Sequence, residues 1–144
     1  SADTTLRLAT DFSNIVAVKE ASGDMDQIMN ILKDKPDDFM VLSGDDALTL
    51  PMIDMGSEGV ISVIAQSHPK DYSDMVNFAL LGDKNMANQI HYRLYDYYTP
   101  LYAEGNPVGI KACLELLGIC HSFVRLPLVE ASVLIKDELK RLLN

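Results

Sequence analysis

The sequence predicts an α/β protein with a parallel β-sheet. Three short apolar runs rich in β-branched residues lie near residues 14–19, 39–43 and 59–63, a pattern typical of strands buried on both faces. Each of the first two runs precedes a segment whose apolar residues recur at helical spacing, and helical spacing continues after the third. This alternation indicates right-handed βαβ units.

The first predicted unit follows a short amphipathic opening that contains Leu6 and Leu8. After the strand near 14–19, the sequence Ser22-Gly23-Asp24 supplies a turn and a helix cap. A helix is predicted over 25–33, with four apolar residues at helical spacing: Met25, Ile28, Met29 and Leu32. The cluster at 35–38, which contains a proline, ends this helix.

The second unit repeats the order of the first. The strand near 39–43 leads into a turn and cap at 43–46, and a short helix over 48–55 is closed by Gly56. After the third strand, near 59–63, four helices are predicted between glycine and proline breakers: 72–81, 84–102, 108–117 and 129–143. We therefore divide the chain into a β/α part at 1–81 and a C-terminal helical region at 82–144.

Three strands are few for a parallel sheet. A closed β/α barrel needs eight strands, and an open sheet of three has two edges that water or another chain must satisfy. Either the protein forms an open three-layer sheet or part of the molecule is missing. In both cases we expect a homo-oligomer or association with a missing half, since apolar faces need cover.

Composition excludes several partners. The formal net charge is −9, and no basic cluster is longer than the pair Lys140-Arg141, so neither nucleic acid nor an anionic membrane is expected to bind. No apolar run is long enough to span a bilayer, and the first residues lack a signal-peptide pattern. We expect a soluble cytoplasmic protein, in which Cys113 and Cys120 are apolar fillers that form neither a disulfide nor a metal site.

The polar residues that end the strands are the candidates for chemistry, because parallel sheets collect functional groups there. Lys19 follows an apolar strand, and a lysine that loses hydration on its inner side becomes a nucleophile toward carbonyl groups. A solvated surface lysine is the alternative. Gly44 and Gly59 serve either turns or close approach to a ligand, and Asp45 with its neighbour Asp46 forms either a helix cap or an acid–base pair.

Aromatic and histidine side chains carry no clear chemical pattern. Five tyrosines stand at mixed helical spacings and are expected to be packing or interface residues: Tyr92, Tyr95, Tyr97, Tyr98 and Tyr102. Three histidines share no spacing and receive no role: His68, His91 and His121.

The run from Asn14 to Asp24, NIVAVKEASGD, closely resembles the Schiff-base lysine strand of the dihydrodipicolinate synthase family. Further segments fall in that family's order and spacing: LSGDD at 42–46, GVISV at 59–63, NPVGIKA at 106–112 and RLPL at 125–128. The resemblance covers essentially the whole chain. It implies the last three β/α units of a (β/α)8 barrel, followed by a C-terminal helical region.

The resemblance also implies a reaction and its residues. Lys19 would form an imine with pyruvate, whose enamine then adds to aspartate semialdehyde on the route to lysine and diaminopimelate. Ile61 would pack against bound pyruvate, and Gly44 would lie in the pocket for the second substrate. No metal or organic cofactor is implied, because the lysine itself is the electron sink.

Members of the family are about twice as long as this chain. Their first five strands carry a carboxylate-binding turn, a proton-relay tyrosine and an arginine that this sequence lacks. We therefore expect a fragment that is inactive or nearly so by itself. Two alternatives remain: a related pyruvate aldolase, such as an N-acetylneuraminate or keto-deoxy-sugar-acid lyase, and a non-catalytic half-barrel that assembles through its open sheet edges.

Overall fold

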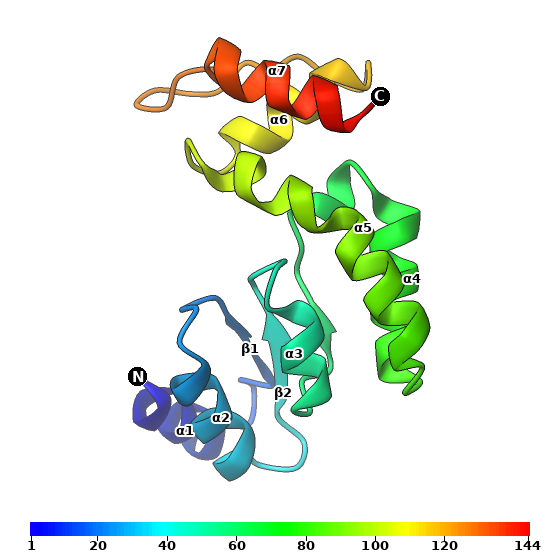
Figure 1. Cartoon of the computed structure of the whole chain (residues 1–144). Coiled ribbons are helices and arrows are strands. Elements are labelled where there is room, and N and C mark those ends of the chain that lie inside the picture. Colours follow the sequence, from blue (N-terminus) through cyan, green and yellow to red (C-terminus); the bar gives the residue numbers. More distant parts are fainter. The chain divides into compact units, whose positions relative to one another are not determined.

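The computed structural model describes residues 1–144 (Figure 1). In chain order the elements are α1 (Ala2–Asp11), β1 (Ala17–Glu20), α2 (Met25–Asp34), β2 (Met40–Ser43), α3 (Thr49–Asp54), β3 (Gly59–Val60), the 3₁₀ helix η1 (Ile64–Gln66), α4 (Pro69–Leu80), α5 (Lys84–Tyr102), α6 (Val108–Leu116) and α7 (Val133–Leu142). They form two compact units, Ser1–Ser62 with Met75–Ala87 and Val63–Asp74 with Asn88–Asn144. The division predicted from the sequence, with a partial barrel at 1–81 and a helical region at 82–144, differs in kind from these two units and stays a prediction.

The first unit contains a three-stranded parallel sheet in the order β1-β2-β3, which confirms the predicted α/β class. Lys19 of β1 lies opposite Leu42 of β2, and Leu42 lies opposite Gly59 of β3. Residues paired in this way point to the same face of a sheet. Parallel strands need a crossover, and α2 and α3 supply the two crossovers here.

Helix α2 forms where its capping residue and its apolar stripe predict it. The Asp24 carboxylate accepts hydrogen bonds from the backbone N–H groups of Asp26 and Gln27, which have no partner inside the helix. Ile28 and Ile31 lie one helical turn apart and are both buried. The predicted cap and helix are therefore confirmed.

One face of the sheet carries the core of the first unit. The buried core cluster draws on α2, α3 and β2, with Val18 of β1 packed against it: Ile28, Ile31, Val41 and Met52. On the opposite face Met40 and Ile61 are 42% and 50% exposed. The prediction that both faces of the strands are buried is wrong, because α2 and α3 pack only on the face of Val18 and Val41.

Several element boundaries differ from the sequence prediction. The opening segment forms α1, whereas β3 ends at Val60 and the chain then turns into η1. Helix α4 begins at Pro69, because proline fits the first position of a helix, where its missing N–H is not needed. Helix α7 begins later than predicted, after Ser132, whose hydroxyl accepts from the Ile135 N–H at 3.4 Å.

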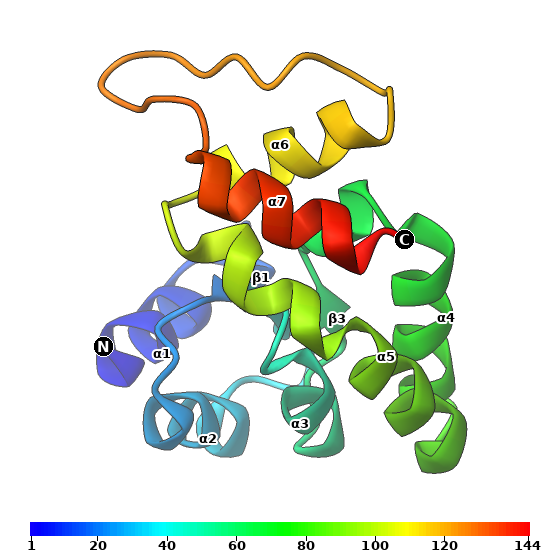
Figure 2. The same ribbon diagram turned by 45° about the horizontal axis from the view of Figure 1, so that its top comes forward.

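The second unit contains helices and no strand. Helix α6 packs against both α7 and η1, and fully buried residues of these elements include Ile64, Ile110 and Leu139. The long connection from α6 to α7 has no regular secondary structure (Figure 2). It is fixed near its start, where the Ser122 N–H donates to the Glu115 carboxylate at 3.0 Å.

No helix combines the length and the apolar character that a bilayer crossing requires. Cys113 is buried and Cys120 is exposed, and both are free thiols. Burial raises the pKa of the Cys113 thiol, against a smaller lowering by Ser67. The prediction of an apolar filler is confirmed for Cys113 and wrong for Cys120, which lies in the irregular segment after α6.

Candidate active site

The three predicted site residues lie at one end of the sheet. Lys19 is in β1, Gly44 directly follows β2, and Ile61 directly follows β3. The Gly44 N–H donates to the Glu20 carbonyl at 2.7 Å, and the Ile61 N–H donates to the Ser43 carbonyl at 2.9 Å, so pairing continues past the strand ends. The structure thus brings the three residues together at the carboxyl edge of the sheet, where parallel sheets place functional groups.

The same three residues also belong to one face of the sheet. Lys19, Leu42 and Gly59 are paired across the strands. Gly44 lies two residues after Leu42, and Ile61 lies two residues after Gly59, so the two-residue period of a strand returns them to this face. It is the open face, on which Ile61 is half exposed.

Lys19 is the only basic side chain on this edge, and it is exposed. Its ammonium group forms no hydrogen bond or ion pair. The prediction that Lys19 loses its hydration is therefore wrong for this chain. An amine with no competing partner is available to a carbonyl compound as soon as it loses a proton.

Glu20 is a site residue whose structural role the sequence did not reveal. Its side chain points to the helix-covered face and is 7% exposed. One carboxylate oxygen accepts from the Ser22 N–H at 2.7 Å, and the other from the Gln27 side-chain amide at 3.4 Å. The signal was its place directly after Lys19, because consecutive strand residues face opposite ways.

The turn after β2 is held by a compact set of hydrogen bonds. The Asp45 carboxylate accepts from the backbone N–H groups of Ala47 and Leu48 at 2.9 and 3.2 Å, so it caps the turn that leads into α3. The Ser43 hydroxyl donates to the Asp45 carbonyl at 2.8 Å. The Thr49 hydroxyl lies 3.0 Å from the Ser43 hydroxyl. These bonds fix the backbone on both sides of the intervening glycine.

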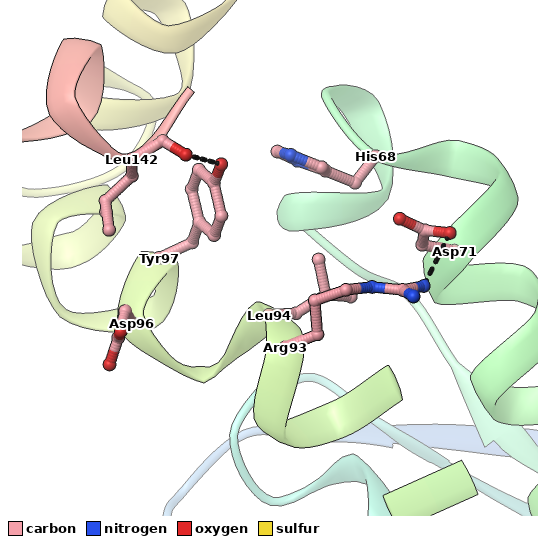
Figure 3. Close-up of a pocket in the computed structure, with 7 residues that line it drawn as sticks. All are labelled: His68, Asp71, Arg93, Leu94, Asp96, Tyr97 and Leu142. Carbon is pink, nitrogen blue, oxygen red and sulfur yellow. Dashed lines mark hydrogen bonds and ion pairs between the residues drawn. The ribbon is translucent and has the colours of Figure 1, made fainter. Parts of the chain in front are cut away.

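A separate cleft of about 360 Å³ lies in the second unit and is lined by His68, Asp71, Arg93, Leu94, Asp96, Tyr97 and Leu142 (Figure 3). Its polar groups largely pair with one another. The Tyr97 hydroxyl donates to the Leu142 carbonyl at 2.6 Å, and the Arg93 guanidinium lies 2.9 Å from the Asp71 carboxylate. The rings of His68 and Tyr97 are 4.5 Å apart, and burial lowers the pKa of His68 although Asp71 opposes this.

The tyrosines of α5 divide between core and surface. Tyr97 and Tyr98 are buried, as expected of packing residues, whereas Tyr92 and Tyr95 are 70% and 53% exposed. The buried His91 ring lies 5.4 to 5.7 Å from three of these rings, and burial lowers its pKa. No three His, Cys, Asp or Glu side chains in the chain are grouped as a metal site requires.

The sequence profile of the Dihydrodipicolinate synthetase family matches residues 1–144. The chain belongs to this family. The resemblance seen in the motifs around Lys19, Gly44 and Ile61 is thereby confirmed at the level of the family.

Named relatives of this dihydrodipicolinate synthetase family member agree with that assignment. The 4-hydroxy-tetrahydrodipicolinate synthase of Phocaeicola vulgatus is 44% identical over 144 residues, which are 100% of this chain and 48% of that protein. A crystal structure of dihydrodipicolinate synthase from Aquifex aeolicus, 43% identical, matches with a TM-score of 0.95 and covers 99% of this chain and 49% of that one.

A third relative is a crystal structure of the chloride-inhibited dihydrodipicolinate synthase from Acinetobacter baumannii, complexed with pyruvate. It is 30% identical and has a TM-score of 0.93 over 99% of this chain and 49% of that chain. The chain therefore spans about half the length of the synthases that it matches.

Proposed function

We propose that this chain carries the Schiff-base lysine of a 4-hydroxy-tetrahydrodipicolinate synthase-type lyase, which condenses pyruvate with aspartate semialdehyde. The observation that carries the proposal is the exposed, unpaired amine of Lys19 at the carboxyl edge of the sheet, on the same face as Gly44 and Ile61. The pyruvate bound by the Acinetobacter baumannii relative supports the choice of first substrate. A cytoplasmic place in the route to lysine and diaminopimelate is part of the proposal.

In the proposed reaction the Lys19 amine attacks the ketone carbon of pyruvate, and loss of water gives an iminium ion. The iminium accepts the electron pair when the methyl group loses a proton, which gives an enamine. The enamine carbon adds to the aldehyde carbon of aspartate semialdehyde, whose oxygen takes up a proton. The amino group of the new chain then attacks the iminium carbon, closes the ring and releases the lysine amine.

Two neighbours of Lys19 would hold the substrates. Ile61 would pack against the bound pyruvate, and Gly44 would line the pocket for the semialdehyde. Since the lysine supplies the electron sink, the proposed chemistry needs no metal or organic cofactor.

We further propose that the three β/α units are the last three of a (β/α)8 barrel and that this chain alone has little synthase activity. The parallel sheet with two helical crossovers supports the first point, together with the match to half of each synthase. Substrate positioning and proton transfer each commonly supply about 3 kcal/mol or more of catalysis. The groups proposed for them lie in the other half of the synthases.

The open face of the sheet exposes apolar side chains that another chain could cover. Met40 and Ile61 are apolar, and each is at least 42% exposed. Burying such residues is favourable, so we propose that the chain associates with itself or with the remaining half of a synthase. Light scattering coupled to size exclusion tests this proposal, and a monomer at all concentrations with no binding of a hydrophobic dye would contradict it.

The decisive experiment treats the chain with pyruvate and borohydride, which reduces an imine to a stable amine. Intact mass and peptide mapping should place one pyruvyl group on Lys19, and Lys19→Arg should abolish it. Lys33→Arg is the matched control, because Lys33 is 75% exposed in the same unit and has no place in the mechanism. Adducts spread equally over several lysines, or persisting in Lys19→Arg, would refute the proposed role.

A further inference from the structure

We propose that Gly44 is a positioning residue that sets the path of the Lys19 side chain, an inference that rests on the proposed imine chemistry of Lys19. A Cβ atom at position 44 would lie 2.7 Å from Lys19 Cε and 3.1 Å from Lys19 Cγ. The aliphatic stem of the lysine therefore lies directly across the Gly44 backbone. A residue with any side chain would take the space that the stem now occupies.

Gly44 is needed for space, and its backbone conformation does not require glycine. Six other glycines have positive φ angles, Gly23 among them at +73°, but Gly44 does not. Gly23 has nothing within 4 Å of its missing Cβ, whereas Gly44 has three atoms inside 3.2 Å. Close approach therefore explains Gly44, and the close neighbour is the proposed nucleophile itself.

The surroundings decide which neighbour would move. A Cβ at Gly44 would also lie 2.6 Å from Ala21 Cβ, an atom attached directly to the backbone. That backbone is held on both sides of Ala21, by the bond from the Gly44 N–H to the Glu20 carbonyl and by the bond from the Ser22 N–H to the Glu20 carboxylate, both 2.7 Å long. Lys19 has no such anchor, so its stem is the part that yields.

The consequence is a displaced amine. Misplacing a reacting group by about 1 Å can lower a rate by about a hundredfold. Gly44→Ala should therefore slow the trapping of the Lys19–pyruvate imine by about ten- to a hundredfold. It should also lower the thermal unfolding midpoint, because the Ala21 contact is too short as well.

A double substitution separates positioning from folding. Gly44→Ala combined with Ala21→Gly removes the clash with the backbone-anchored methyl group and leaves the clash with Lys19. Compared with Ala21→Gly alone, the double variant should recover the thermal midpoint but still trap pyruvate at the low rate. If the double variant traps pyruvate as fast as Ala21→Gly alone, the inference is overturned.

A measurement without pyruvate keeps the two proposals distinguishable. Nuclear Overhauser contacts between the Lys19 Cγ and Cε protons and the Gly44 Cα protons should be present in the unmodified chain. Their absence would overturn the inference whatever the chemistry of Lys19. Their presence in a chain that forms no adduct would support the side-chain path and refute only the proposed imine function.

Discussion

Replacing Glu58 by alanine should unpair a buried backbone group at the start of β2. The Glu58 carboxylate accepts from the Val41 N–H at 2.8 Å, ahead of β3, which begins only at Gly59. The other carboxylate oxygen accepts from the Lys35 ammonium at 2.9 Å. The Glu58 side chain thus accepts the hydrogen bond that a residue of a longer β3 would otherwise accept. Val41 itself is completely buried.

The magnitude follows from these two bonds. A buried N–H group without a partner costs about 1 to 3 kcal/mol. The ion pair adds about 0.5 to 1 kcal/mol, since its partners are 15% and 36% exposed and Lys35 keeps its bond to the Phe39 carbonyl. Glu58→Ala should therefore lower the free energy of unfolding by about 1.5 to 4 kcal/mol, whereas Glu58→Gln, which keeps an acceptor for Val41, should cost about 1 kcal/mol or less.

Urea denaturation with an unchanged slope gives both free energies, and hydrogen exchange of the Val41 amide reports the local opening. Lys33→Ala is the control, because it removes only the exposed pair with Asp34 at 3.6 Å and should shift stability by less than about 0.5 kcal/mol. The reasoning fails if Glu58→Ala costs no more than Glu58→Gln, or if exchange at Val41 stays unchanged.

Three further predictions concern the second unit. Gly109→Ala should lower the free energy of unfolding in urea by about 1 to 3 kcal/mol, because the new Cβ would overlap the Leu101 carbonyl oxygen, an atom of the backbone. The Ser122 N–H bond holds the pKa of Glu115 below its usual value, so its contribution to stability is present above the unfolded-state pKa and is lost as pH falls through the folded-state pKa. The protection factors of the amides in residues 118–132, which correct for the intrinsic slowing of exchange in acid, should therefore fall as the pH is lowered, and much less so in Glu115→Gln. Burial lowers the pKa of His68, so an NMR titration should place it below 6.5. The stability contributed by the neutral ring should be present above the unfolded-state pKa and be lost as pH falls through the lower folded-state pKa, and a titration at or above 6.5 would contradict the burial argument.

The sequence predicted the elements whose causes are local. Helix α2 was predicted because Asp24 caps it and because Ile28 repeats the apolar stripe, and both signals lie within a few residues. The open face of the sheet could not be predicted in this way. Met40 and Ile61 are apolar, and an apolar strand residue gives the same pattern whether or not another layer covers it in this chain.

The site was predicted only as far as the strand ends. The rule that parallel strands collect functional groups at their carboxyl edge selected Lys19 and Gly44, and the family resemblance added Ile61. The contact between Lys19 and Gly44 depends on how β1 and β2 are aligned, and that register is set by hydrogen bonds between residues far apart in the sequence. The burial of Glu20 depends on the same alignment.

The register of β1 also links stability to the proposed chemistry. Slipping β1 by one residue would exchange the faces of Lys19 and Glu20, which would put the amine against the helices and expose the carboxylate that holds the next turn. Two bonds between these strands oppose such a slip: from the Met40 N–H to the Val16 carbonyl at the start of β2, and from the Gly44 N–H to the Glu20 carbonyl at its end. Backbone hydrogen bonds between β1 and β2 therefore decide which face of the sheet presents the proposed nucleophile.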